Sequence, residues 1–376
     1  MKRLITTVLL SAALLALGAG MACAKTLKIG TMGPLTGPYA ADGTDIRNGV
    51  LTAVEVVKAN GGLKGFDDIV VLPQDTACEP RQAVAVANKL INEGANGVVG
   101  SYCSSATLPA SEVLDEESII MITPASTNEK VTSRGLPYMF RVCGRDDDQS
   151  KTAIKFMKDE LKAKSVYVVD DKTAYSQGLA DSIEKGAPEA GIKVLGHEHV
   201  NQGDKDFSAI LTKVKTSNPD VFYVSMQNSA TGALMLIQAK RMGINAAIIA
   251  QDAVYHPQLI DIAKDASEGV FLTFGYTDKE SPVYKEFESK YTPAHGDIGA
   301  YSAYAYDSAM AYMKAVEAAG TTDPEKVRDA LMKLDYNGAS KQIKFKPNGD
   351  SGSDYIIFKV DGGKFKNYWN PSTGYY

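Results

Sequence analysis

The sequence predicts an α/β protein made of two doubly wound, Rossmann-like lobes with parallel sheets. Short apolar runs alternate with helix-like segments, which is the rhythm of βαβ units. This rhythm runs through one stretch, pauses near residues 143–146, and then repeats in a second stretch. The chain has 376 residues, too many for one compact core and suitable for two domains.

The first 24 residues, MKRLITTVLLSAALLALGAGMACA, have the pattern of a secretory signal peptide. Two basic residues precede a long apolar run, and small residues follow, so we expect cleavage after Ala24. The alternative is a lipoprotein with Cys23 at its N-terminus, although Gly20 stands where such a signal needs a bulkier apolar residue. No other stretch reaches the roughly 18 apolar residues of a membrane span.

The charge and the cysteines narrow the class of protein further. The formal net charge is −5, and it becomes more negative when the signal peptide is removed, so nucleic acid and anionic membranes are poor partners. Cys78 and Cys103 each follow a predicted strand and could form a disulfide after export, or they could be two unrelated thiols. Cys143 is predicted to be a buried thiol, with a reactive thiol as the alternative. The cysteine spacing does not match a zinc site.

The first lobe contains five predicted strands and two clear helices. A strand at 26–32 leads into a loop, GPLTGPYAADG, whose glycines and prolines argue against regular structure. A helix at 44–60 follows and ends at Gly61-Gly62. The remaining strands are predicted at 69–72, 97–100, 119–122 and 138–142, with a helix at 79–93.

The second lobe repeats the pattern, and a helical block follows it. Helices are predicted at 148–161, 175–190, 206–215 and 231–242, between the strands SVYVVD, IKVLGHEHV, DVFYVSM, IIAQDA and GVFLTFGYTD. Helices at 282–291, 301–319 and 324–334 come next, and the strands QIKF and YIIFKV close the chain. We expect the chain to cross between lobes near 143–146, 274–277 and 348–354. The predicted division is residues 25–145 and 275–353 for the N-terminal lobe, and 146–274 and 354–376 for the C-terminal lobe.

Hydroxyl-rich loops follow two neighbouring strands of the first lobe, SYCSS after 97–100 and TPAST after 119–122. Ligands of open α/β sheets bind at the carboxyl ends of the strands, where helix N-termini offer free N–H groups. Ser104 and Thr127 are therefore candidates to hold a carboxylate. Asp252, at a strand end of the other lobe, is a candidate for an ammonium group. The alternative for all three residues is a helix N-cap.

No common catalytic motif is present, neither GxSxG, GxGxxG, P-loop nor HExxH. We therefore expect no enzyme, no catalytic residue and no cofactor. His197 and His199 share a face of a predicted strand and could hold a metal. We favour the alternative, a solvent-facing pair, and expect no metal site.

Long motifs spread over almost the whole mature chain resemble one family. They are GPLTGPYAADG, NGGLKG, DTACEPRQAVAVANK, CSSATLPAS, MITPAST, SRG, D-x-DQ, DK-x-x-Y-x-x-GLA, KDFS and AYDS. The chain resembles the periplasmic leucine/isoleucine/valine-binding proteins of ABC transporters, which are type I bilobal binding proteins.

The resemblance implies three crossovers between the lobes, a Cys78–Cys103 disulfide, and an L-amino acid as ligand. Its α-carboxylate would be held by Ser104 and Thr127. Its α-ammonium would be shared among the Ala125 carbonyl, Thr127 and Asp252, with Tyr175 and Tyr301 as walls of the pocket. The resemblance also implies a periplasmic monomer that docks on a membrane permease.

The chain departs from the family pattern where the ligand side chain should lie. Asp42 and Gln227 replace aromatic residues, and Asp252 replaces a longer glutamate. An unpaired carboxylate buried beside an aliphatic ligand costs several kcal/mol or becomes protonated. We therefore expect a polar or basic amino acid, or a broad range of them. The alternative is that Asp42 faces solvent at the cleft mouth and the ligand is branched-chain.

Three other function classes remain open at this point. One is a sensory protein with the same lobes, which we would expect to continue into a membrane helix or signalling domain. Another is a binder of a different small carboxylate or amide. The last is a secreted enzyme, against which the missing nucleophile–base pair argues.

Overall fold

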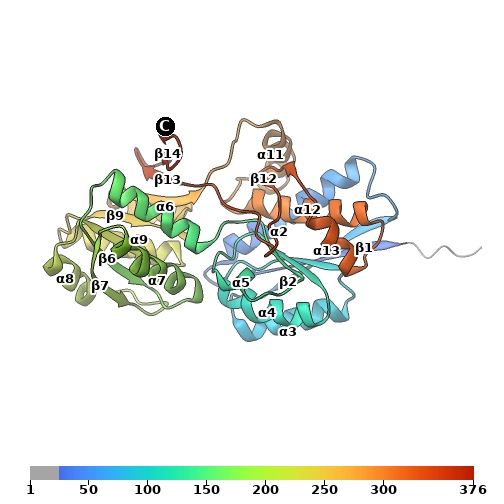
Figure 1. The fold of residues 1–376 in the computed structure, drawn as a ribbon, viewed down its shortest axis with the longest axis horizontal. Helices are drawn as coiled ribbons and strands as arrows, with labels where there is room; N and C mark the ends of the chain where they lie inside the picture. Colours follow the sequence, from blue (N-terminus) through green and yellow to red (C-terminus); the bar gives the residue numbers. More distant parts are fainter. Residues whose placement is uncertain (1–24) are drawn as a thin grey trace, which may run out of the picture.

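The computed structural model describes residues 25–376, so the predicted signal peptide and Cys23 lie outside the described residues. Two α/β lobes lie side by side (Figure 1). The N-terminal lobe has a five-stranded parallel sheet in the order β2-β1-β3-β4-β5. Its strands are β1 Thr26–Gly33, β2 Asp68–Asp75, β3 Gly97–Gly100, β4 Ile120–Thr123 and β5 Met139–Arg141.

Helices cover both faces of this sheet. Their bounds are α2 Ala40–Ala59, α3 Pro80–Asn92, α4 Ser104–Glu116, α5 Lys130–Ser133, α11 Pro282–His295, α12 Ser302–Ala319 and α13 Pro324–Leu331, and a short ribbon joins β11 Tyr336–Asn337 to β12 Gln342–Ile343. Helix α2 packs against α12, and α3 packs against α4 on the other side (Figure 1). The α2–α12 contact needs a glycine, because a Cβ atom on Gly49 would lie 2.4 Å from the Ser302 carbonyl oxygen.

The C-terminal lobe has an eight-stranded mixed sheet in the order β15-β14-β13-β10-β9-β8-β6-β7. Its strands are β6 Ser165–Asp170, β7 Lys193–His199, β8 Val221–Ser225, β9 Ala247–Ala250, β10 Phe271–Gly275, β13 Tyr355–Val360, β14 Phe365–Asn370 and β15 Gly374–Tyr375. Its helices are α6 Asp146–Asp159, α7 Ala174–Glu189, α8 Ser208–Ser217, α9 Ser229–Arg241 and α10 Pro257–Ala263, with short 3₁₀ turns at Asp252–Val254 and Lys264–Ala266. Strands β6 to β10 are parallel to one another. Strands β13 to β15 continue the sheet in antiparallel orientation.

The chain connects the two sheets three times. It passes from β5 to α6, returns from β10 to α11, and passes again from β12 to β13. The predicted fold class, with two doubly wound lobes and a three-stranded hinge, is confirmed. The residue limits that we drew for the lobes stay a prediction.

Several predicted element bounds were wrong. Helix α2 begins at Ala40, inside the glycine- and proline-rich loop, because Gly43 is a packing residue and not a helix breaker. A Cβ atom on Gly43 would lie 1.9 Å from the Pro34 carbonyl oxygen. The strand predicted at 342–345 is only two residues long, and the terminal strands β14 and β15 were not predicted.

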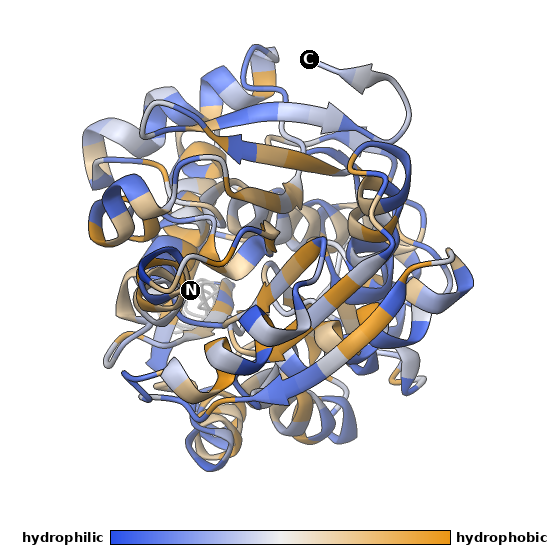
Figure 2. Cartoon of the chain, turned by 90° about the vertical axis from the view of Figure 1, so that its left-hand side faces the viewer, coloured by the Kyte–Doolittle hydropathy of each residue, from blue (hydrophilic) through white to orange (hydrophobic). Residues whose placement is uncertain are grey.

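Hydropathy follows the layers. Apolar residues concentrate on the strands and polar residues on the outer surfaces of the helices (Figure 2). Within residues 25–376, every helix is too short or too polar to span a bilayer.

Cys78 and Cys103 form a disulfide, as the family resemblance implied, with their Cα atoms 5.5 Å apart. The bond joins the loop after β2 to the N-terminus of α4. In the chain-entropy model, such a cross-link stabilises the folded state by roughly 3–4 kcal/mol. Cys143 is a buried free thiol in the described chain, and burial raises its pKa.

The disulfide and the buried Cys143 predict how many thiols react in a protein that begins at residue 25. Denatured without reductant, it should release one reactive thiol per chain, from Cys143. In the native state this thiol should react far more slowly, since it is buried and protonated. A thiol-reactive chromophore measures both rates, and a count of three thiols would contradict the disulfide.

Candidate functional site

The polar cleft lies where the carboxyl ends of the two sheets face each other. From the N-terminal lobe, the loops after β3 and β4 reach it, and from the C-terminal lobe, the segments after β6, β8 and β9. The two lobes touch directly. The Asn128 amide donates to the Ala174 carbonyl over 2.7 Å, and the Gln202 amide donates to the Tyr39 hydroxyl over 3.0 Å.

The N-terminal side of the cleft presents the predicted hydroxyl groups. Ser104 begins α4, and its Oγ accepts the Asn128 N–H over 3.3 Å. Thr127 is 1% exposed. Within residues 25–376 its Oγ1 makes no hydrogen bond of ordinary geometry, although the hydroxyl lies close enough to Asp146 to lower the pKa of that acid. Ala125 is also buried in the same loop. Because a buried hydroxyl normally has a partner, Thr127 is suited to binding a polar ligand group.

Other hydroxyls hold these two loops together. Thr123 donates to the Ser101 carbonyl over 2.9 Å, and Ser126 donates to the Tyr102 carbonyl over 2.9 Å. Short hydroxyl side chains can satisfy backbone groups that a loop cannot pair by itself. The hydroxyl-rich composition of the loops is therefore partly structural.

A buried ion pair anchors the loop that carries Thr127. Arg141 at the end of β5 is fully buried and donates to the carbonyls of Ser126 and Asn128 over 3.1 and 2.7 Å. Its guanidinium also contacts the Asp350 carboxylate at 2.7 Å. Asp350 belongs to the third crossover, so this pair connects the binding loop to the hinge.

On the C-terminal side, Asp252 lies at the centre of a hydrogen-bond network. It accepts from the Tyr175 hydroxyl over 2.5 Å, from the Gln149 amide over 2.9 Å, and from the Tyr301 hydroxyl of the other lobe over 3.3 Å. Burial raises the pKa of Asp252 although these donors oppose it. A nearby cation would stabilise the charged form of this buried carboxylate.

Asp146 is a second acid beside the cleft that the sequence analysis did not select. It begins α6 and is 1% exposed. Within residues 25–376 neither carboxylate oxygen makes a hydrogen bond of ordinary geometry, but the Thr127 hydroxyl lies close enough to lower its pKa. Burial, with Asp252 nearby, raises its pKa well above the usual range. The D-x-DQ motif contains Asp146 and Gln149, so it was the available signal for both residues.

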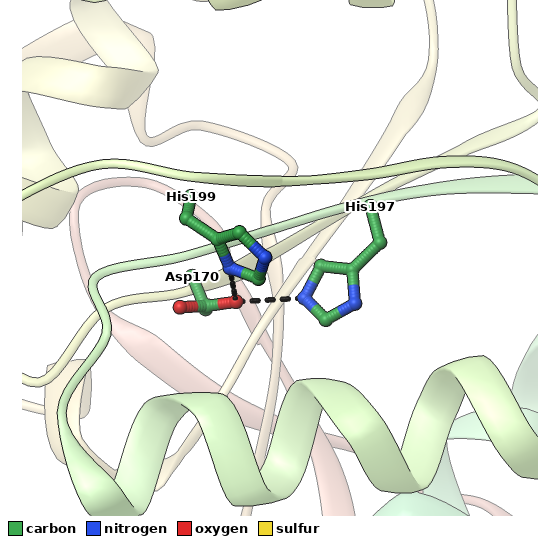
Figure 3. A group of neighbouring side chains, drawn as sticks. All are labelled: Asp170, His197 and His199. Carbon is green, nitrogen blue, oxygen red and sulfur yellow. Dashed lines mark hydrogen bonds and ion pairs between the residues drawn. The ribbon is translucent and has the colours of Figure 1, made fainter.

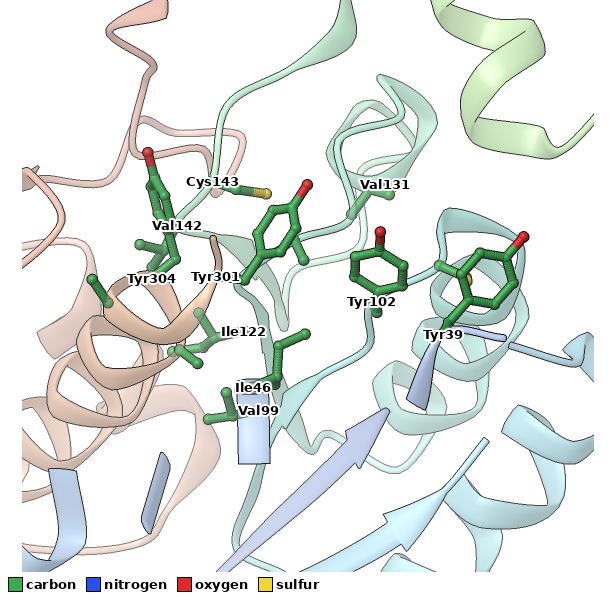
Figure 4. Packing of buried hydrophobic residues seen from close by; sticks show 14 of the residues in the cluster. Tyr39, Ile46, Val99, Tyr102, Ile122, Val131, Val142, Cys143, Tyr301 and Tyr304 are labelled. Atoms are coloured by element: carbon green, nitrogen blue, oxygen red, sulfur yellow. The ribbon is translucent and has the colours of Figure 1, made fainter. Parts of the chain in front are cut away.

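Tyr39, Tyr102, Tyr301 and Tyr304 form a row along the floor of the cleft (Figure 4). Their hydroxyls point the same way, away from the apolar residues of the N-terminal lobe. The rings of Tyr102 and Tyr301 meet edge to face at 5.5 Å. Sequence reasoning also missed Tyr102, whose buried hydroxyl has no hydrogen-bond partner among residues 25–376.

The position of Tyr301 is set by Asp45 of α2. Asp45 accepts the Tyr301 backbone N–H over 3.0 Å and the Tyr291 hydroxyl over 2.8 Å, and it also bonds the Ser302 hydroxyl. The carboxylate therefore caps the start of α12. Because α2 and α12 carry these groups, both helices orient the wall of the cleft.

The structure does not bring Asp42 and Gln227 into one cavity. Asp42 lines a cavity of about 980 Å³ beside α2, whereas Gln227 lines another of about 610 Å³. The Gln227 amide donates to the Cys103 sulfur of the other lobe over 3.0 Å, and its backbone N–H donates to Asp171 over 2.8 Å. Burial and the neighbouring Asp45 raise the pKa of Asp42 to about 7.

Groups from both lobes meet at a third, small cavity of about 10 Å³ that Thr127, Asp252 and Tyr301 help to line. A water molecule fills such a volume, so a larger ligand enters only when the lobes separate. In the described chain, the clusters that could hold a metal lie elsewhere, around His197.

Two lobes on a three-stranded hinge, with a polar cleft between them, define a ligand-binding protein of the bilobal type. The periplasmic binding protein family profile matches residues 26–364. A leucine-, isoleucine-, valine-, threonine- and alanine-binding protein of Pseudomonas aeruginosa is 37% identical over 338 residues, which cover 89% of this chain and 90% of that protein.

Solved structures agree with this assignment. A leucine-binding protein of Thermotoga maritima is 31% identical, with a TM-score of 0.86 over 92% of this chain and 99% of that one. A branched-chain amino acid transporter substrate-binding protein of Streptococcus pneumoniae, in complex with isoleucine, is 26% identical with a TM-score of 0.83, over 91% and 98%. The chain belongs to the periplasmic binding protein family, among the branched-chain amino-acid-binding proteins of ABC transporters.

The Arg141–Asp350 pair predicts a large stability effect. Asp350→Ala should lower the free energy of unfolding by about 3–5 kcal/mol, because it leaves a buried guanidinium without its partner. Urea denaturation measures the loss. The matched control is Asp329→Ala, which removes an exposed pair with Arg328 and should cost less than about 1 kcal/mol.

The same pair has a defined pH dependence. Burial alone would raise the pKa of Asp350, but Arg141 and the other donors hold it below the ordinary value. The stability that the Arg141–Asp350 pair contributes is therefore present at neutral pH. It is lost as the pH falls through the depressed pKa of Asp350, below about 4. The difference between native protein and Asp350→Ala should narrow toward pH 3. A difference that is constant with pH would contradict this origin.

Proposed function

We propose that this protein captures an L-amino acid in the cleft between its lobes and delivers it to a membrane ABC permease. One observation carries the proposal: Thr127 and Asp252, from opposite lobes, face the same small cavity. The buried Thr127 hydroxyl suits the α-carboxylate, with Ser104 beside it. The buried Asp252 carboxylate suits the α-ammonium, and Asp146 places a second buried carboxyl group on the same side.

This arrangement couples binding to closure. The carboxylate site is on one lobe and most of the ammonium site is on the other, so a bound amino acid contacts both. A ligand shifts an equilibrium toward the state that it contacts best, here the closed one. Tyr175 and Tyr301 then form walls, and Tyr301 already reaches Asp252 across the cleft. We propose that this closed, exported monomer is the form that docks on the permease.

The side-chain specificity is the finer part of the proposal. Asp42 borders the cavity of about 980 Å³, and its pKa of about 7 lets it accept or donate a hydrogen bond near neutral pH. Gln227 lines a separate cavity of about 610 Å³, and its amide already contacts the Cys103 sulfur. An aliphatic ligand would leave such groups unpaired, at about 1–3 kcal/mol each unless water remains. We therefore propose a polar or basic amino acid, or a broad range, as ligand.

A thermal-shift screen of the twenty L-amino acids tests this specificity. Ligands that bind the folded state raise the unfolding temperature. At least one polar or basic amino acid should raise it as much as leucine does. Benzoate, which has a carboxylate but no ammonium, is the control and should give little shift. Stabilisation by leucine, isoleucine and valine alone would reject the polar side-chain site.

Asp252→Ala tests the ammonium site with the amino acid that gives the largest shift. Calorimetry should show an affinity loss of at least about 2 kcal/mol, roughly thirtyfold, since a buried ammonium loses its partner. Asp265→Ala is the control, because this acid is exposed and pairs with Lys240 at the surface. Unchanged binding in Asp252→Ala would mean that Asp252 has only a structural role.

A further inference from the structure

Asp170, His197 and His199 gather at the outer edge of the C-terminal sheet, on strands β6 and β7. Asp170 pairs with His199 in the parallel register, and His197 lies two residues earlier. Since side chains alternate along a strand, all three project from the same face of the sheet. Figure 3 shows both imidazole rings directed at one oxygen of Asp170.

The contacts are short and converge on one atom. Nε2 of His197 lies 2.7 Å from Oδ2 of Asp170, and Nδ1 of His199 lies 2.6 Å from the same oxygen. The other oxygen, Oδ1, accepts the Lys172 N–H over 2.7 Å and so fixes the orientation of the carboxylate. The Asp170 side chain is fully buried, while the His199 side chain is 38% exposed.

The second nitrogen of His197 has its own partner. Nδ1 lies 2.8 Å from Oε2 of Glu184 on helix α7. Metal-binding histidines in proteins usually donate their other ring N–H to such a carboxylate, which fixes the tautomer and leaves the opposite nitrogen free for the metal. Asp170, His197 and His199 thus supply the donor atoms, and Glu184 orients the ring of His197 from outside.

We propose that Asp170, His197 and His199 bind one Zn²⁺ ion, in a site separate from the amino-acid cleft. Two imidazole nitrogens and one carboxylate oxygen are a donor set that zinc takes readily, whereas calcium and magnesium prefer oxygen alone. The exposed side of His199 leaves room for a water as fourth ligand. None of the three residues lines the cleft cavities.

The geometry requires only a small adjustment. Tetrahedral zinc with bonds of about 2.1 Å needs donor atoms about 3.4 Å apart. The three donor atoms lie within 4.8 Å of one another, and the two short contacts must lengthen by less than about 1 Å. His199 can supply much of this movement because its ring is partly exposed.

The competing explanation is an ion pair without metal. Burial alone would lower the pKa of His197, but Asp170 and Glu184 outweigh it and raise the pKa to about 9. A protonated His197 accounts for its own contact with Asp170. A His199 that donates its Nδ1–H to the same oxygen accounts for the second contact. The zinc titration described below separates this ion pair from a metal site.

The test uses untagged protein from residue 25 onward, stripped of metal with EDTA and then dialysed. Titration with ZnCl₂ in a calorimeter at pH 7.5 should give one ion per chain with a micromolar or lower Kd. The zinc content measured after equilibrium dialysis should also be one ion per chain. Co²⁺ should give the visible absorption bands of a tetrahedral site, and Zn²⁺ at a hundredfold excess over Kd should raise the unfolding temperature by several degrees.

His199→Ala should weaken Zn²⁺ binding at least tenfold, and this partly exposed position can be changed without disturbing the core. His197→Ala should do the same if it folds. The control is His256→Asn, which removes a histidine elsewhere and keeps a residue that can cap α10. Absence of saturable Zn²⁺ binding, or equal binding by His199→Ala and native protein, would overturn the proposal and leave an ion pair.

Discussion

The buried guanidinium of Arg141 is the group on which the geometry of the cleft depends most. It is fully buried at the end of β5, and a buried cation is tolerated only when its donors are satisfied. Its partners are the carbonyls on either side of Thr127 and the carboxylate of Asp350. The loop that carries Thr127, the end of the first sheet and the third crossover are thus fixed to each other. Arg145, just before α6, adds a second contact to Asp350 at 3.0 Å.

The two sides of the cleft differ in what they offer a ligand. The N-terminal side presents hydroxyl and backbone donors near the start of α4, and a helix N-terminus favours negative charge. The C-terminal side presents Asp252 and Asp146, whose pKa values burial raises because the charged forms lose water. This polarity suits a zwitterion in one orientation. Bringing the sides together without a cation would leave the acids poorly compensated.

The side chains around the cleft differ in how firmly they are held in place. Tyr301 is fixed through Asp45 and α12, and Gln227 is held at its backbone by Asp171. Asp42, in contrast, borders a wide cavity. Fixed groups around Tyr301, with open space beside Asp42, are a physical basis for the breadth of specificity that we propose.

The sequence by itself determined the alternation of strands and helices, the fold class and the family, because these depend on local periodicity and on long motifs. It also selected Ser104, Thr127 and Asp252, since each follows a strand end, and Tyr175 and Tyr301 through the family resemblance. Only the tertiary structure showed that Arg141 meets Asp350, that Asp146 is buried close to Asp252, and that Asp42 and Gln227 line separate cavities. It also showed that His197 and His199 contact the buried Asp170, whereas the sequence favoured a solvent-facing pair. Such relations join residues far apart in the chain, and their energies depend on burial and distance, which no local pattern encodes.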